Sequence, residues 1–205
     1  MFKRFPNPML LWDVDTQVDF MVPEGRLYVP GAEGIVPNLR RLTRWADENG
    51  VPVVSSACAH QPDDPELQEF GPHCMAGTPG QQKIPETLLP NRFIVFNRPI
   101  ELPDLHTFQQ IIIEKQAFDV FTNPNADEVL RRCGENLSIV LYGVVTDICV
   151  ASAAWSLLER GRQVQLVADA VHALDPAKAV KFLAEFRERG GEIVQAETVV
   201  RARAA

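Results

Sequence analysis

Short apolar runs alternate with segments of helical spacing along the chain, and this alternation limits the fold more than any other feature. The run 9–14, MLLWDV, predicts a strand, and the run 51–56 predicts another. Between them, segment 33–49 repeats apolar residues at the spacing of one helical face, and Gly50 ends it. A strand, a helix and a second strand in this order imply a parallel pair with a right-handed crossover.

The same alternation continues through the rest of the sequence, without an internal repeat or a linker that would divide it. We therefore predict a single domain over residues 1–205 with an α/β fold, a three-layer α/β/α arrangement around a doubly wound, mostly parallel sheet of about six strands. Functional residues of such folds lie at the carboxyl ends of the strands. Further strands are predicted at 92–97, 110–113, 137–142, 164–168 and 192–195, and helices at 125–134, from about 147 to 160, and at 176–189.

Composition excludes several classes of partner. The chain has 205 residues, 46% of them hydrophobic, and a formal net charge of −7 without a basic cluster, so we expect neither nucleic acid nor an anionic membrane as a partner. The short apolar run near the start is interrupted by Asp13, so segment 1–15 predicts neither a secretory leader nor a membrane span. The four cysteines form no CxxC pair, which favours reduced thiols and a cytoplasmic location.

The stretch Leu137–Trp155, LSIVLYGVVTDICVASAAW, places a cysteine where a strand passes into a helix. Thr146 or Asp147 is a plausible N-cap, which puts Cys149 just inside the helix N-terminus. Free N–H groups and the helix dipole at that position favour a thiolate nucleophile and can hold an oxyanion. The alternative is that Cys149 is an ordinary small core residue, because free cysteines are often buried.

Two other residues with suitable chemistry also follow predicted strands. Asp15 comes after the first strand and Lys115 after the strand 110–113, so both leave the same sheet edge as Cys149. A carboxylate can take the thiol proton as a general base, and an ammonium lowers a thiol pKa, so the trio suits acyl transfer through a thioester. Asp13 and Asp19 compete with Asp15 for this role. The alternative to a catalytic role is that Asp15 is an ordinary residue at a strand end and Lys115 a solvated surface lysine.

Four segments, in this order, resemble the isochorismatase-like cysteine hydrolases, the superfamily that includes the nicotinamidases. DTQVDF at 15–20 resembles its D-x-Q-x-D-F element, EKQAFDVF at 114–121 its lysine segment, and GVVTDICV at 143–150 its nucleophile loop. PHCMAGTPG at 72–80 resembles a segment of the nicotinamidase-like branch. The resemblance covers residues 10 to about 170 and is nearest to that branch.

The resemblance implies a mechanism and a substrate. It makes Asp15 the general base, Lys115 the cationic partner and Cys149 the nucleophile. It implies a cis peptide before Val145 and an oxyanion hole formed by the N–H groups of Val145 and Cys149. It implies a small planar amide as substrate, with nicotinamide favoured, and a homodimer or homotetramer. The pocket residues that it implies are Phe20, Phe70 and Phe118.

The resemblance also implies a metal site, with one departure. Nicotinamidases hold a metal at positions that match His60, His73 and Glu66, but their first ligand, an aspartate, is replaced here by Cys58. Cysteine, histidine and carboxylate ligands suit Zn²⁺ or another divalent metal, although the cysteine chemistry itself requires no cofactor. The alternative is that both histidines are hydrogen-bonded loop residues. The remaining cysteines and histidines have no predicted role: Cys74 and Cys133 are expected to pack, and His106 and His172 to lie in loops or at helix starts.

Other functions remain open at this point. A carbamoyl-amide hydrolase or an isochorismatase-type hydrolase would use the same fold, and a carboxylated substrate would need a cation, for which Arg92 and Arg98 are candidates. A non-catalytic metal- or redox-sensing module would use the two histidines with Cys58 and Cys74. A dinucleotide-binding domain is disfavoured, because the loop after the first strand lacks G-x-G-x-x-G.

Overall fold

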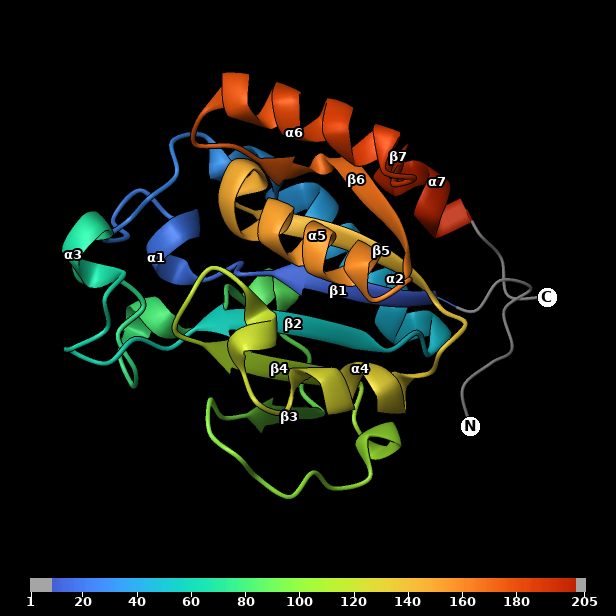
Figure 1. Cartoon of the computed structure of the whole chain (residues 1–205), viewed down its shortest axis with the longest axis horizontal. Helices are drawn as coiled ribbons and strands as arrows, with labels where there is room; N and C mark the ends of the chain where they lie inside the picture. The colour runs from blue at the N-terminus through green and yellow to red at the C-terminus, as the bar shows by residue number, and fades with distance from the viewer. Residues whose placement is uncertain (1–8, 202–205) are drawn as a thin grey trace.

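Seven parallel strands form one sheet through the middle of the molecule (Figure 1). This computed structural model describes residues 9–201; the expectation for the start of the chain therefore falls largely on residues 1–8, outside the described part. The strand order is β3-β4-β2-β1-β5-β6-β7, which confirms the predicted doubly wound fold. The strands are β1 (Met9–Val14), β2 (Val53–Cys58), β3 (Arg92–Val95), β4 (Gln110–Lys115), β5 (Ser138–Val144), β6 (Gln163–His172) and β7 (Glu192–Val194).

Helices cover both faces of the sheet, which makes three layers (Figure 1). The helices α2 and α7 pack on one face, and α4, α5 and α6 pack on the other. Two short helices, α1 and α3, lie in loops at the carboxyl edge of the sheet. The helices are α1 (Val18–Met21), α2 (Val36–Asn49), α3 (Leu67–Phe70), α4 (Ala126–Cys133), α5 (Ala151–Glu159), α6 (Pro176–Glu188) and α7 (Ala196–Arg201).

The central strand β1 shows how the sequence divides between the two faces. Leu11 belongs to the apolar cluster under α2, whereas Leu10 and Trp12 belong to the cluster under α4, α5 and α6. Successive side chains of a strand point to opposite faces, so a continuous apolar run is required when both faces are covered. All three side chains are fully buried.

The structure differs from the sequence prediction mainly where strands and helices end. Strand β5 continues through Gly143 to Val144, and β6 reaches His172, so His172 ends a strand instead of lying in a loop. Its Nε2 atom lies 2.8 Å from the Pro30 carbonyl oxygen. The helices α1, α3 and α7 were not predicted, because each is too short to show a periodic apolar face.

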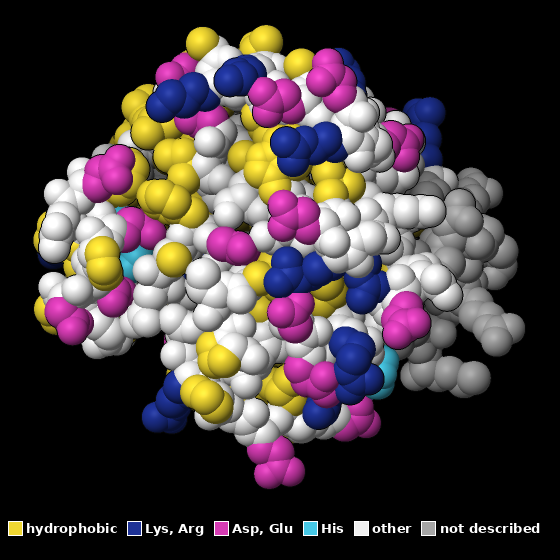
Figure 2. Space-filling model, viewed as in Figure 1, with side chains coloured by type: hydrophobic (Ala, Val, Ile, Leu, Met, Phe, Trp, Pro, Cys, Tyr) yellow, Lys and Arg dark blue, Asp and Glu magenta, His cyan; other side chains and the backbone are white. Residues whose placement is uncertain are grey.

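Charged side chains of both signs are mixed over the face shown in Figure 2. The ion pair Arg131–Glu128 lies on the exposed part of α4, and Arg160, directly after α5, pairs with Asp127 of α4. Exposed pairs of this kind contribute little to stability. Within residues 9–201, every helix is too short or too polar to cross a membrane.

Candidate active site

The carboxyl edge of the sheet brings the predicted trio together. Asp15 directly follows β1, Lys115 is the last residue of β4, and Cys149 lies in the turn after β5. Strands β1 and β5 are neighbours at which the strand order reverses, the position where doubly wound sheets hold their ligands. The position of these residues therefore follows from the order of the strands.

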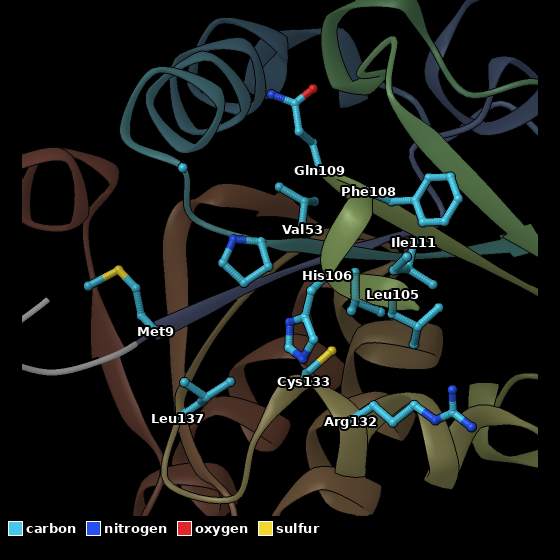
Figure 3. Close-up of a pocket in the computed structure, with 13 residues that line it drawn as sticks. Met9, Val53, Leu105, His106, Phe108, Gln109, Ile111, Arg132, Cys133 and Leu137 are labelled. Carbon is cyan, nitrogen blue, oxygen red and sulfur yellow. The ribbon is translucent and has the colours of Figure 1, made fainter. Parts of the chain in front are cut away.

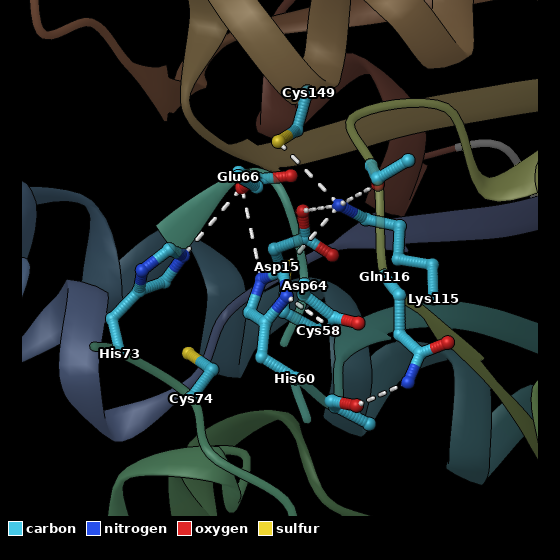
Figure 4. A network of polar contacts seen from close by, with 12 residues as sticks. Asp15, Cys58, His60, Asp64, Glu66, His73, Cys74, Lys115, Gln116 and Cys149 are labelled. Carbon is cyan, nitrogen blue, oxygen red and sulfur yellow. Dashed lines mark hydrogen bonds and ion pairs between the residues drawn. The ribbon is translucent and has the colours of Figure 1, made fainter. Parts of the chain in front are cut away.

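The Lys115 ammonium is the centre of this group (Figure 4). Its Nζ atom lies 3.0 Å from Asp15 Oδ2 and donates to the Cys149 Sγ at 3.6 Å and the Ala117 carbonyl at 3.0 Å. The other Asp15 oxygen accepts a hydrogen bond of 2.7 Å from the Ser56 hydroxyl. The three side chains are buried, so their charges interact through a medium of low dielectric.

Burial and neighbouring charges set the protonation of this group. Burial raises the pKa of the Cys149 thiol well above its usual range, although the Lys115 charge opposes this rise. Burial alone would lower the pKa of Lys115, but Asp15, Cys149 and Cys58 together outweigh it and raise that pKa well above its usual value. The resting arrangement is therefore a neutral thiol beside an ammonium and a carboxylate, with the carboxylate placed to accept the thiol proton.

The backbone around Cys149 is unusual. The peptide between Val144 and Val145 is cis, and a single π-helical turn, Thr146–Val150, follows it before α5 begins at Ala151. The Val145 carbonyl accepts the N–H groups of Ile148 and Val150. π-Turns inside helices are frequent at functional sites.

The predicted N-cap at the start of this turn is wrong. The residue before the turn is Val145, and neither Thr146 nor Asp147 caps it. The Asp147 carboxylate instead accepts the backbone N–H groups of Leu174 and Asp175, which fixes the loop between β6 and α6. The polar residues Thr146 and Asp147 do begin the turn, as the sequence pattern predicted. The Asp147 side chain, however, binds a loop that is distant in sequence.

The two competing aspartates have other partners. Asp13 is fully buried and pairs with Lys83 at 2.7 Å; burial raises its pKa, against the effect of that lysine. Asp19 accepts the backbone N–H groups of Arg26 and Cys74 and so ties two loops together. Only Asp15, among these three acids, faces Cys149 and Lys115.

A pocket of largely apolar lining opens beside the Cys149 thiol. Its enclosed volume is about 40 Å³. The predicted phenylalanines all line it, and Phe70 meets Phe118 edge to face at 5.9 Å between ring centroids. Sequence reasoning missed four apolar members of the wall, because their loops meet only in the folded chain: Leu27, Val29, Ile148 and Leu174.

The predicted metal-binding residues also converge, next to the same pocket (Figure 4). One ligand atom from each of Cys58, His60, Glu66 and His73 lies within 4.8 Å of all the others. Both histidine Nε2 atoms are buried and have no hydrogen-bond partner. Burial lowers the pKa of His60, which favours the neutral imidazole that binds metals. These four side chains fit a divalent metal ion.

One positioning residue was not singled out from the sequence. The Gln17 amide donates to the Cys58 carbonyl at 2.8 Å and accepts the Cys58 N–H at 2.7 Å. This pair of bonds fixes the end of β2 relative to the turn that carries Asp15. The signal was present, since Gln17 is the third residue of the DTQVDF segment.

Comparison with known proteins identifies the family. The isochorismatase domain model matches residues 9–198, nearly the whole described chain. The chain belongs to the isochorismatase family. Its similarity to a nicotinamidase and to an N-carbamoylsarcosine amidase supports a hydrolase.

Isochorismatase-family proteins similar to this chain include several amidases. A nicotinamidase of Acinetobacter baylyi is 27% identical over 188 residues, which cover 82% of this chain and 83% of that protein. The structure of a pyrazinamidase of Pyrococcus horikoshii in complex with zinc has a TM-score of 0.73 and 28% identity, covering 92% of this chain and 99% of that one. An N-carbamoylsarcosine amidase of Thermoplasma acidophilum has a TM-score of 0.72 and 31% identity, covering 93% and 97%.

The arginines considered for a carboxylated substrate lie outside the pocket beside Cys149. Arg92 donates to the Leu89 carbonyl, and Arg98 lies over the Phe96 ring. Neither lines the pocket beside Cys149, whose charged or titratable lining is Glu66, His73 and Cys149 itself.

A second cavity lies at the opposite end of the strands (Figure 3). It has a volume of about 90 Å³ and is mainly apolar, with Met9 and Val53 at the starts of β1 and β2. Half-buried Cys133 lines it, and Cys74 is buried in the core near Asp19. This cavity contains none of the trio and is separated from it by the length of the sheet.

Proposed function

We propose that this protein is a cysteine amidohydrolase that acts on a small, planar, uncharged carboxamide, with nicotinamide as the first substrate to test. The observation that carries the proposal is the shared contact of Lys115 with the Asp15 carboxylate and the Cys149 thiol, at the wall of an apolar pocket. The similarity to named amidases supports the same class of reaction.

The first half-reaction transfers the acyl group to sulfur. The Cys149 thiol gives its proton to Asp15 as the sulfur attacks the carboxamide carbon, and the carbonyl electron pair moves to oxygen. The N–H groups of Val145 and Cys149 are proposed to hold this oxyanion. Asp15 then protonates the amide nitrogen, the C–N bond breaks, and ammonia leaves a thioester on Cys149.

The second half-reaction regenerates the enzyme. Asp15 takes a proton from water as the water oxygen attacks the thioester carbon. The C–S bond then breaks, the carboxylic acid leaves, and the proton returns to the Cys149 sulfur. Lys115 stays protonated throughout, which keeps one positive charge beside two groups that carry negative charge in turn.

The metal centre is proposed as a part of the pocket wall. Glu66 and His73 belong both to the pocket lining and to the metal cluster. A divalent ion held by Cys58, His60, Glu66 and His73 would supply a Lewis acid that can bind a lone pair of the substrate. The chemistry at Cys149 does not require the ion to form or break a bond.

Two alternatives are weaker on specific observations. A hydrolase of a carboxylated substrate, such as an isochorismatase-type or carbamoyl-amide hydrolase, would need a cation in the pocket, and neither Arg92 nor Arg98 lines it. A metal- or redox-sensing module does not require Asp15 and Lys115 beside the Cys149 thiol.

A cytoplasmic location is proposed because the cysteines are free. The dimer or tetramer stays a prediction.

Trapping of the acyl-enzyme tests the proposal. The protein is incubated with nicotinamide, pyrazinamide, an aliphatic amide and a carbamoylated amino acid, quenched in acid and analysed by peptide mass spectrometry. We expect an acyl adduct on Cys149 with the uncharged planar amides, and release of ammonia. Cys149→Ala should abolish both, whereas Cys133→Ala, a half-buried cysteine of the other cavity, should retain both. Turnover by a folded Cys149→Ala protein would overturn the mechanism.

A further inference from the structure

Two edges of the metal cluster have the length expected for a tetrahedral site. The distance from Glu66 Oε1 is 3.7 Å to the Nε2 atom of His60 and 3.5 Å to that of His73. Metal–ligand distances of about 2.0–2.3 Å give edges of about 3.3–3.8 Å between the ligands of a tetrahedral zinc ion. Two carboxylate–imidazole edges therefore match a common central ion.

Both imidazoles are oriented for ligation by partners on their other nitrogen. The His60 Nδ1 lies 3.0 Å from the Asp64 carboxylate, and the His73 Nδ1 lies 2.9 Å from the Gly71 carbonyl. Such partners fix the tautomer that leaves Nε2 with a free lone pair. Both Nε2 atoms are buried without a hydrogen-bond partner and belong to fully buried side chains.

Cys58 completes this group from a rigid position. It is the last residue of β2, and its backbone is held on both sides by the Gln17 amide. Its Sγ atom accepts a hydrogen bond of 3.2 Å from the Lys115 ammonium, so a cation already lies beside the sulfur. A thiol that coordinates a divalent metal loses its proton.

The charges of such a centre balance. Two neutral imidazoles, the Glu66 carboxylate and a Cys58 thiolate cancel the charge of one divalent ion, while Lys115 is paired with Asp15. Ligands that cancel the charge of the ion avoid the penalty of an uncompensated buried ion. Soft thiolate ligands favour zinc-like ions, whereas sites of oxygen ligands suit Mg²⁺, Ca²⁺ and Mn²⁺.

We infer that Cys58 is a thiolate ligand, and that it makes this centre selective for thiophilic divalent ions such as Zn²⁺, Co²⁺ and Cd²⁺ over Mn²⁺ and Mg²⁺. The inference rests on the metal centre of the proposed function, but not on hydrolysis by Cys149. The preference for these metal ions thus depends on one atom, the Cys58 sulfur at the end of β2.

Cobalt spectroscopy of the full chain tests this assignment. The protein is freed of metal with a chelator under reducing conditions and titrated with Co²⁺ alone. We expect one equivalent to bind with a near-ultraviolet sulfur-to-cobalt charge-transfer band. Cys58→Asp should still bind Co²⁺ but without the band, and its preference for Zn²⁺ over Mn²⁺ should fall by ~10-fold or more relative to the wild type.

Three further variants test which residues bind the cobalt ion. Cys74→Ser and Cys149→Ser change the other thiols near Lys115 and Asp15, and both should keep it. His73→Ala should lower the Co²⁺ affinity by ~10-fold or more, since it removes a ligand. A band that survives in Cys58→Asp, a wild-type protein that binds Co²⁺ without the band, or no Co²⁺ binding would each overturn the inference. An intact band in a protein without amidase activity would overturn only the proposed hydrolysis.

Discussion

Lys115 Nζ lies 3.0 Å from Oδ2 of Asp15, and each side chain is at most 1% exposed. The two residues come from β4 and from the turn after β1, which are separated in the sheet by β2. The contact therefore exists only when three strands are in register. Because the same ammonium also contacts the Cys149 sulfur, a change at Lys115 should affect both the stability of the sheet edge and the proposed chemistry.

Removal of the Lys115 charge should destabilise the fold. In Lys115→Met the Asp15 carboxylate would stay buried without its cation, and breaking a buried pair in this way costs about 3–5 kcal/mol. The double variant Asp15→Asn/Lys115→Met should recover part of this loss, since neither charge remains. Urea unfolding of the three proteins measures the effect. The matched control is Lys181→Met, an exposed lysine near Glu185, which should change stability by less than about 0.5 kcal/mol. Equal stabilities for the single and double variants would contradict a coupled pair.

The pH dependence of Cys149 alkylation should report the buried thiol. Burial raises the pKa of this thiol and Lys115 lowers it, with burial dominant. Because the thiolate is the reactive form, the alkylation rate should still be rising at pH values above about 8.5, where a free cysteine is already half ionised. Lys115→Met removes the opposing charge, so its profile should shift to higher pH. Mass spectrometry of iodoacetamide-treated protein gives the site and the rate. A profile with a midpoint near neutral pH in the wild type would contradict the prediction that burial outweighs the charge of Lys115 at this thiol.

The sequence allowed the sheet and the trio to be predicted for one physical reason. Parallel strands all end at the same edge, so Asp15, Lys115 and Cys149 could be placed together once their strands were recognised. The choice among three aspartates could not be made from local sequence. It depends on partners such as Lys83 and the Cys74 N–H, which the long loop after β2 supplies.

The pocket wall and the turn at Cys149 were harder to predict for a related reason. Leu27 and Leu174 line the pocket beside the thiol and come from loops whose course is fixed by contacts between distant residues. The Leu174 loop, for example, is held by the Asp147 carboxylate, a residue that local pattern assigned to a helix cap. Patterns of period two or 3.6 describe strands and helices, but they carry no information on such loop contacts.

Gly143 should be intolerant of any side chain. It has a φ angle of 120°, and a Cβ atom there would lie 2.1 Å from the Val14 carbonyl oxygen. Because that oxygen belongs to the backbone of the central strand β1, it cannot move without breaking the pairing with β5. Gly143→Ala should therefore lower stability by more than ~3 kcal/mol. Gly34→Ala, where a Cβ meets nothing within 4 Å, is the matched control and should be near neutral. Thermal unfolding compares the two, and equal midpoints would contradict the predicted close approach.

Phe118 should affect substrate binding more than the chemical step. It lines the pocket at 38% exposure and packs edge to face against Phe70, so it can contact a planar substrate without touching the reacting sulfur. An aromatic contact of this kind is worth about 0.5–1.5 kcal/mol, so Phe118→Ala should raise KM for nicotinamide about 2- to 13-fold with little change in kcat. Phe96→Ala, at 45% exposure and outside the pocket, should leave both constants unchanged. Steady-state ammonia release measures them. A lower kcat at unchanged KM would instead place Phe118 in the transition-state contacts, because only an interaction made there alone alters kcat by itself.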